Sequence, residues 1–168
     1  YNLFDYSVII LCNVRNLPFG YEGELEKFIM LGGSLLITLG DQIDAKFYNE
    51  KLGNILPVYL KALHQNTNGD TSSLFFVEPS KHPALKIFEG QTLEEMKSIR
   101  FSSLYTTEPR EDSDFTTPMI FENKFPALIE STVGKGKVFL FVSSIDRDWN
   151  NFSIQPTFLP WVQRWVKY

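Results

Sequence analysis

Polar and reactive side chains follow three short apolar runs of this sequence. They are Cys12 and Asn13 after the first run, Gly40 and Asp41 after the second, and Ser143, Ser144 and Asp146 after a third near the C-terminus. In an open α/β sheet, ligands bind beyond the carboxyl ends of the strands, where such loops meet. We therefore take these seven residues as candidate ligand-binding residues.

Cys12 and Asp41 have the chemistry of a nucleophile. A cysteine nucleophile needs a base or a helix N-terminus that lowers its pKa, and neither His64 nor His82 follows one of the three runs. We expect Cys12 to be a small buried hydrophobe, and Asp41 to form a turn or cap a helix. We predict no catalytic residue. The alternative is a hydrolase or transferase of altered chemistry that uses an Asp or Cys at this edge.

Two further segments imitate cofactor sites. Residues 134–137, Gly-Lys-Gly-Lys, lack the strand-before, helix-after order of a phosphate loop, because strands are expected on both sides. Asp146 and Asp148 could bind a divalent cation, but no further acidic ligand is near in sequence, and a self-capping loop is the simpler interpretation. We predict neither a metal nor a cofactor.

Composition limits the classes of protein. The 168 residues fit one domain spanning 1–168, and the net charge of −4 disfavours a nucleic-acid surface, which would be basic. One cysteine excludes an internal disulfide. The longest apolar run, Val8 to Cys12, is far too short to cross a bilayer, so we expect no membrane contact by this segment.

The elements that position the candidate residues follow from hydrophobic periodicity. Residues 5–11 and 34–39 read as buried strands on either side of a helix over 22–31, a parallel βαβ unit. A helical stretch over 45–63, split by Pro57, comes next. The second half reads as strands, with hairpin turns at 122–125 and 134–137 and a last helix over 157–167. Trp149 and the aromatic residues after it are expected to be structural.

Several segments together resemble a known family. They are DYSVIILCNV, GGSLLITLGD, YNEKLGNILP, HPALKIF, FPALIESTVGKGKVFLFVSSIDRDWNNF and PTFLPWVQRWVKY. In this order they resemble the class I glutamine amidotransferase-like domain of bacterial BatA-type (aerotolerance-regulator-like) membrane proteins. More distantly, the GKGKV hairpin is similar to that of trehalose-utilisation-type and β-galactosidase middle domains.

The resemblance implies a fold and a cellular setting. The fold class would be α/β and flavodoxin-like: a parallel sheet with a β-rich insertion and a C-terminal antiparallel hairpin plus helix. The domain would follow membrane helices and a von Willebrand factor A-like region, so we expect a piece of a longer, membrane-anchored protein, in a periplasmic part of the bacterial cell envelope. A cytoplasmic location is the alternative, because a chain with one cysteine fits either compartment.

The resemblance does not bring catalysis with it. The family's enzymes need a Cys at the elbow and a His–Glu pair after the last hairpin strand, whereas this chain has Gly40 and Asp41, then Ser143 and Ser144, and no His beyond residue 82. We therefore expect a catalytically silent module for interaction or ligand sensing. Its partners would be other protein domains of the same chain or complex.

Overall fold

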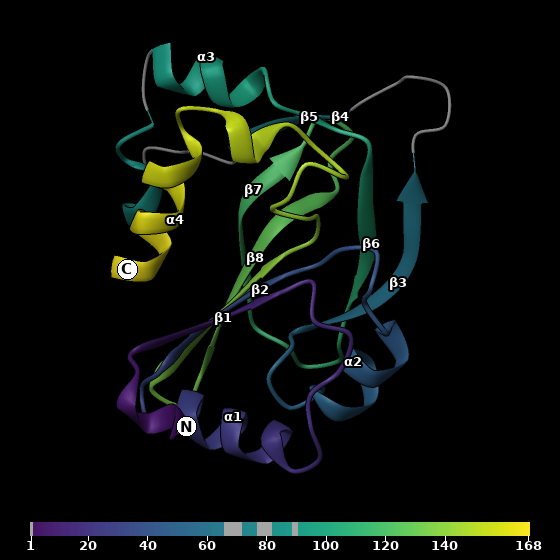
Figure 1. Ribbon diagram of the computed structural model, residues 1–168, viewed down its shortest axis with the longest axis vertical. Helices are drawn as coiled ribbons and strands as arrows, with labels where there is room; N and C mark the ends of the chain where they lie inside the picture. The colour runs from purple at the N-terminus through teal and green to yellow at the C-terminus, as the bar shows by residue number, and fades with distance from the viewer. Residues whose placement is uncertain (1, 66–71, 77–81, 89–90) are drawn as a thin grey trace.

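A seven-stranded mixed sheet forms the centre of the molecule. The computed structural model describes residues 2–65, 72–76, 82–88 and 91–168 (Figure 1). The strand order is β1-β2-β9-β8-β7-β4-β5. The bounds are β1 (Val8–Cys12), β2 (Ser34–Thr38), β9 (Gly136–Phe141), β8 (Pro126–Val133), β7 (Thr116–Phe121), β4 (Ser72–Phe76) and β5 (Arg100–Phe101).

A second, two-stranded sheet and four helices flank this centre. β3 (Val58–Gln65) pairs antiparallel with β6 (Ser103–Pro109). α1 (Tyr21–Met30) and α2 (Ala45–Lys51) lie on one side of the main sheet, and α3 (Gln91–Lys97) and α4 (Phe158–Lys167) lie on the other (Figure 1). Three short 3₁₀ helices complete the described elements: η1 (Leu3–Asp5), η2 (Pro83–Leu85) and η3 (Phe152–Ile154).

The N-terminal βαβ unit forms as its periodicity predicts. α1 buries Leu25, Phe28 and Ile29, which recur at helical spacing. β1 and β2 pair in parallel, from Val8 opposite Ser34 to Cys12 opposite Thr38. β2 in turn pairs in parallel with β9. The carboxyl ends of these three strands therefore reach the same edge of the sheet.

The predicted flavodoxin-like fold class is wrong. Among the described strands of this sheet, the parallel pairs are β1–β2 and β2–β9, whereas β9–β8, β8–β7, β7–β4 and β4–β5 are all antiparallel pairs. The β-rich second half is not an insertion into a parallel sheet, because its strands continue the sheet itself. The fold is a β-rich mixed sheet with few helices.

The helix predicted over 45–63 is also wrong beyond its first turns. α2 ends at Lys51, and residues 58–65 form β3 instead. Val58 and Leu60 are buried while Tyr59 between them is exposed, the period-two pattern of a strand. The rest of β3 is exposed, so the hydrophobic pattern that would mark it as a strand covers only three residues.

Aromatic packing secures α4 on its face of the sheet. The Trp161 ring is tilted against that of Phe141 at 5.2 Å between ring centroids, and Trp165 lies 5.1 Å from Phe139. Both tryptophans are fully buried, and rings of this size contribute much of a core's buried area. Phe139 and Phe141 are two residues apart in β9 and so point to the same face of the sheet, which is the face that α4 covers.

Trp149 is buried, as expected, and its replacement tests its structural role. Its ring is 5% exposed and lies 6.0 Å from that of Tyr105, and its carbonyl accepts from the Ser102 backbone at 2.7 Å. Trp149→Ala should lower the free energy of unfolding by about 3 kcal/mol because it leaves a large cavity. The measurement is thermal or denaturant unfolding.

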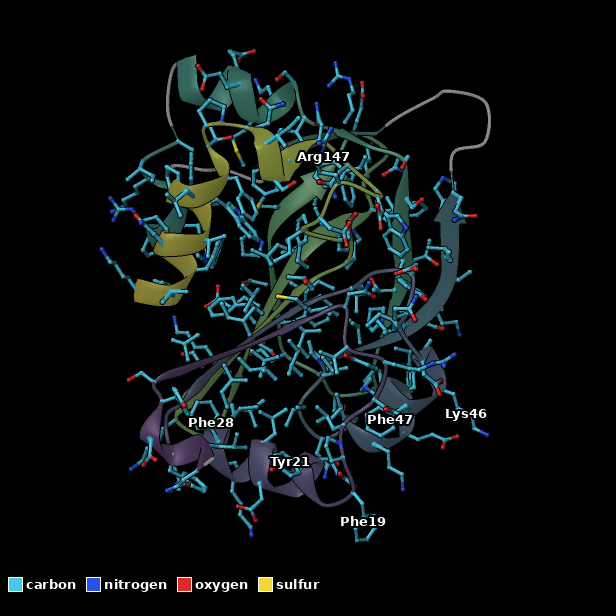
Figure 2. All side chains as sticks on the ribbon, in the orientation of Figure 1. Phe19, Tyr21, Phe28, Lys46, Phe47 and Arg147 are labelled. Carbon is cyan, nitrogen blue, oxygen red and sulfur yellow. The ribbon has the colours of Figure 1, made fainter. Side chains whose placement is uncertain are left out.

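Phe19→Ala is the matched control for that experiment. Phe19 is 100% exposed and points away from the molecule at its lower rim (Figure 2). Its loss should leave the melting temperature unchanged. Equal melting temperatures for the wild type and the Trp149 variant would contradict the structural role of Trp149.

Candidate functional site

The loops after β1 and β2 meet, and Asn13 joins them. Asn13 Nδ2 donates to Asp41 Oδ1 at 2.8 Å, and Asn13 Oδ1 accepts from the Gln42 backbone N–H at 3.0 Å. Asn13 has a left-handed backbone with φ of 51°, a conformation that asparagine tolerates better than most residues. A Cβ on Gly40 would collide with the Asn13 side chain, so only glycine leaves room for this bridge.

Asp41 is held as a carboxylate at this junction. Its second oxygen, Oδ2, accepts from Gln42 Nε2 at 2.8 Å. The hydrogen bonds from Asn13, and then from Gln42, lower the pKa of Asp41 below its ordinary value. A carboxylate with a lowered pKa is a weak base and a weak nucleophile at neutral pH.

Cys12 is exposed, contrary to the expectation of a buried thiol. β1 is the outermost strand of the sheet, and none of the described strands pairs with its free side. Partial burial nevertheless raises the pKa of the thiol, and the neighbouring Thr38 side chain lowers it by less. The thiolate that a nucleophile requires is therefore disfavoured.

The candidates after β9 form a separate, self-contained loop. Ser143 and Ser144 are buried: the Ser143 hydroxyl donates to the Ser103 carbonyl at 2.8 Å, and the Ser144 hydroxyl donates to Asp146 Oδ1 at 2.7 Å. Asp146 also accepts from the Asp148 backbone N–H, and Asn150 Nδ2 donates to the Ser144 carbonyl at 2.7 Å. This is the self-capping loop that the sequence favoured over a cation site.

The structure thus brings Asn13, Gly40 and Asp41 into contact and keeps Ser143, Ser144 and Asp146 among their own neighbours. Tyr105 lies close to both groups. Its backbone N–H donates to the Val142 carbonyl, and burial, followed by the charges of Asp41 and Asp44, raises the pKa of its hydroxyl. Two side-chain amides, a hydroxyl and a backbone N–H donate to the carboxylates of Asp41 and Asp146 within the described chain, and none of these donors belongs to His or Lys.

A second polar cluster lies away from this edge, on the face that α4 covers. Glu130 Oε2 is 2.7 Å from His82 Nε2, and Glu130 Oε1 accepts from Lys137 Nζ at 3.2 Å. His82 Nδ1 accepts from the Ala84 backbone N–H, so Nε2 carries the proton of the neutral ring. The Lys137 ammonium lies 3.4 Å from the centre of the Tyr168 ring. We call these four residues, His82, Glu130, Lys137 and Tyr168, the Glu130 cluster.

Three members of the Glu130 cluster, His82, Glu130 and Tyr168, line a cavity of about 330 Å³, whose lining also includes Asp114, Phe115 and Thr116. Burial would lower the pKa of Lys137, but Tyr168 and Glu130 together raise it above its ordinary value. Sequence reasoning missed the cluster. Its signal was a glutamate inside the apolar run of β8, because a buried carboxylate needs partners.

The Asn13 bridge predicts coupled effects of two substitutions. Gly40→Ala should lower the free energy of unfolding by about 1–3 kcal/mol because the new methyl group displaces Asn13. In an Asn13→Gly background, where the backbone conformation is kept and the side chain is gone, the cost should be smaller by about 1 kcal/mol. Asn13→Gly alone should also raise the pKa of Asp41, measured by NMR titration. Equal costs in both backgrounds would refute the bridge.

The Glu130 cluster predicts a stabilising role for its carboxylate. Glu130→Ala should lower the free energy of unfolding at neutral pH by about 2 kcal/mol, less than for a fully buried pair because Lys137 is partly exposed. The matched control is Glu122→Ala, in the exposed turn between β7 and β8. An effect no larger than that of the control would show that the cluster contributes nothing.

The same comparison has a defined pH dependence. The pKa of Lys137 is raised by folding, so its pairing stabilises the fold below the ordinary lysine pKa and is lost as pH rises through the raised value. The difference between wild type and Glu130→Ala should therefore shrink in strongly alkaline solution.

Comparisons with solved structures show where else this fold occurs. Cytoplasmic Protein STM3548 from Salmonella typhimurium matches with a TM-score of 0.79 and 17% identity, over 98% of this chain and 72% of that one. Cytoplasmic Protein STM1381 from Salmonella typhimurium LT2 matches with a TM-score of 0.68 and 16% identity, over 96% and 69%. A β-galactosidase from Rahnella sp. R3 matches with a TM-score of 0.70 and 14% identity, over 99% of this chain and 24% of the enzyme.

These comparisons correct the family resemblance. No protein-family model matches the chain, and no curated protein matches it. The structural neighbours are differently named proteins, so the resemblance to an amidotransferase-like BatA domain is wrong, together with the von Willebrand factor A association it implied. At these identities the likeness concerns the fold alone.

The expected setting is corrected in the same way. Two of the neighbours are named as cytoplasmic proteins, which contradicts the predicted membrane-anchored, periplasmic location in the cell envelope. Within the described ranges of the chain, no helix is long and apolar enough to cross a membrane.

Proposed function

We propose that this domain is a non-catalytic interaction module that binds other protein segments. The observation that carries the proposal is the closed hydrogen bonding at the carboxyl edge of the sheet. Asp41 is satisfied by Asn13 and Gln42, and Asp146 is satisfied by Ser144 and a backbone N–H. A carboxylate that already accepts hydrogen bonds from neighbouring residues of its own chain is poorly placed to accept a proton from a substrate.

The pKa directions support the same proposal. The thiol of Cys12 is shifted toward its neutral form and the carboxyl of Asp41 toward its charged form. A nucleophilic cysteine needs the opposite shift, and a general acid needs a raised carboxyl pKa. The alternative, a hydrolase or transferase that uses Cys12 or Asp41, would have to reverse both shifts on binding its substrate.

The occurrence of the fold is consistent with a module. It makes up about a quarter of the matched β-galactosidase and most of each matched Salmonella protein. A fold that is found both within a larger enzyme and in smaller proteins is suited to be a building unit, and fold alone assigns no activity.

The test of this proposal is an activity comparison. The wild type is compared with a triple variant that carries Cys12→Ser, Asp41→Asn and Asp146→Asn. The assays follow the release of ammonia from glutamine and of nitrophenol from nitrophenyl acetate, nitrophenyl phosphate and nitrophenyl galactoside. We expect the two proteins to give the same background rate for every substrate.

Turnover by the wild type that disappears in the triple variant would overturn the proposal and restore the enzyme hypothesis. Single variants would then identify the residue responsible. The control is far-ultraviolet circular dichroism of the triple variant: a spectrum equal to that of the wild type would show that a lost rate comes from the lost side chains and not from unfolding.

A further inference from the structure

β1 is an edge strand that lacks the usual protection of such strands. Its sequence, VIILC, contains no charge and no proline, and none of its five residues is fully buried. Edge strands of natural proteins are normally protected by charged residues, proline or bulges, because their free backbone groups can pair with another chain. Among the described strands, none pairs with the free side of β1. This side is therefore open to a further strand.

The hydrogen bonds at the two ends of β1 show which of its backbone groups are free. The Ser7 carbonyl accepts from β2 at 3.0 Å, and the Asn13 N–H donates to β2 at 2.9 Å. In a parallel strand, alternate residues direct both backbone groups to the same neighbour. The odd-numbered residues of β1 therefore face β2, and the backbone groups of Val8, Ile10 and Cys12 face outward.

These three outward residues are placed symmetrically about Ile10. When a second copy is related to the first by a two-fold axis beside Ile10, the two β1 strands run antiparallel, and Ile10 lies opposite Ile10 of the second copy. Val8 then lies opposite Cys12 of the second copy. Each such pair exchanges two backbone hydrogen bonds. This register uses all the outward backbone groups of both strands.

The apolar side chains match in the same register. Ile10 is 38% exposed, and it lies beside the same side chain of the second copy. Cys12 is exposed as well, and it lies beside Val8 of the second copy, which is partly exposed. Directly opposite apolar residues stabilise the pairing of antiparallel strands. β1 is thus complementary to itself in its backbone and in its side chains.

The charges that flank β1 are complementary in this register too. Asp5 lies three residues before Val8, and Arg15 lies three residues after Cys12. Antiparallel pairing about Ile10 therefore brings the Asp5 end of each copy to the Arg15 end of the other. Both side chains are exposed, and within the described part of the chain neither forms an ion pair. A second copy supplies each of them with an opposite charge.

The other end of the sheet is a poor partner for β1. β5 has only two residues, and its Phe101 forms a bridge with Asn150. A head-to-tail contact between copies would pair β1 with this short strand and leave most of the outward groups of β1 unpaired. A two-fold contact pairs the same edge of both copies, and it closes after two copies.

From these observations we infer that β1 is the interface of a symmetric dimer, in which a second copy of this chain pairs antiparallel with β1 about Ile10. The two main sheets then join into one continuous sheet. An interface built on one five-residue strand is small, and small protein–protein interfaces are typically weak and transient, so the dimer should dissociate on dilution. The inference concerns assembly and does not depend on the proposed function.

The first test is sedimentation velocity over a concentration series from the micromolar to the millimolar range. The wild type should shift from monomer to dimer, without larger species. Ile10→Lys places two ammonium groups opposite each other at the axis, so it should raise the Kd of the dimer by about tenfold or more. The matched control is Leu159→Lys, at a 62% exposed side chain of α4, which should leave the Kd unchanged.

The flanking charges give a second test by charge reversal. Asp5→Arg and Arg15→Asp each place like charges opposite each other, so each should raise the Kd by about threefold or more. The double variant restores opposite charges in both places, and its Kd should return to within about twofold of the wild type. A double variant that is weaker than either single variant would contradict the register.

The third test fixes the register by cross-linking and leaves Ile10 in place, so it remains valid if Ile10→Lys fails to fold. Val8→Cys lies opposite the natural Cys12 of the second copy, with the Cα atoms about 5.5 Å apart, which is within the reach of a disulfide. Mild oxidation should therefore give a covalent dimer. In Val8→Cys with Cys12→Ser, the two cysteines lie about 13 Å apart along the strands, so no such dimer should form.

The outcomes are distinct. A concentration-dependent dimer that is weakened by Ile10→Lys and cross-linked only when positions 8 and 12 are both cysteine supports the inference. A monomer at every concentration overturns it, and the edge is then free for another occupant. A dimer that persists in Ile10→Lys, or that cross-links equally well without Cys12, also overturns it, because another surface or register is then used. None of these results depends on the activity assay, so the inference and the proposed function can fail separately.

Discussion

The close approach of α1 to the turn between β8 and β9 sets the arrangement of the whole sheet. The Met30 carbonyl at the end of α1 accepts from the Lys135 N–H at 3.1 Å. A Cβ on Gly136 would collide with the carbonyl oxygens of Ile29 and Gly33, so the two segments can touch only because Gly136 has no side chain. This contact holds the start of β9 beside the start of β2, with Lys137 opposite Ser34.

That contact also explains where the polar loops lie. With the starts of β1, β2 and β9 aligned, their carboxyl ends coincide, and the following loops reach one edge. Each loop then meets its backbone and side-chain needs locally, through Asn13 in one case and Asn150 in the other. The polar groups at this edge hold their own loops in place.

Local patterns in the sequence were enough to predict the parts of the fold that rest on neighbouring residues. The β1–α1–β2 unit, the β8–β9 hairpin and α4 have clear periodicity or turn residues. β3 was not predicted because only Val58 and Leu60 are buried along it. The fold class was predicted wrongly because it depends on which distant strands pair, such as β4 with β7, and local sequence patterns do not indicate that pairing. The sequence predicted that Asn13 and Asp41 lie at the same edge of the sheet. It did not predict the hydrogen bond between them, because that bond depends on the φ of Asn13 and on the space left by Gly40.

The position of β9 between β2 and β8 has a consequence for how the protein is made. β2 ends at Thr38, and its second neighbour ends only at Phe141, so the ribosome must synthesise about a hundred further residues before β2 can be enclosed. Until then the nascent β1–α1–β2 unit exposes two aliphatic strands with an open side each. Contacts so distant in sequence also slow folding. The last third of the chain therefore determines when the strands of the first third are fully paired. A chain that is cut short before β9 would expose these strands and be prone to aggregate.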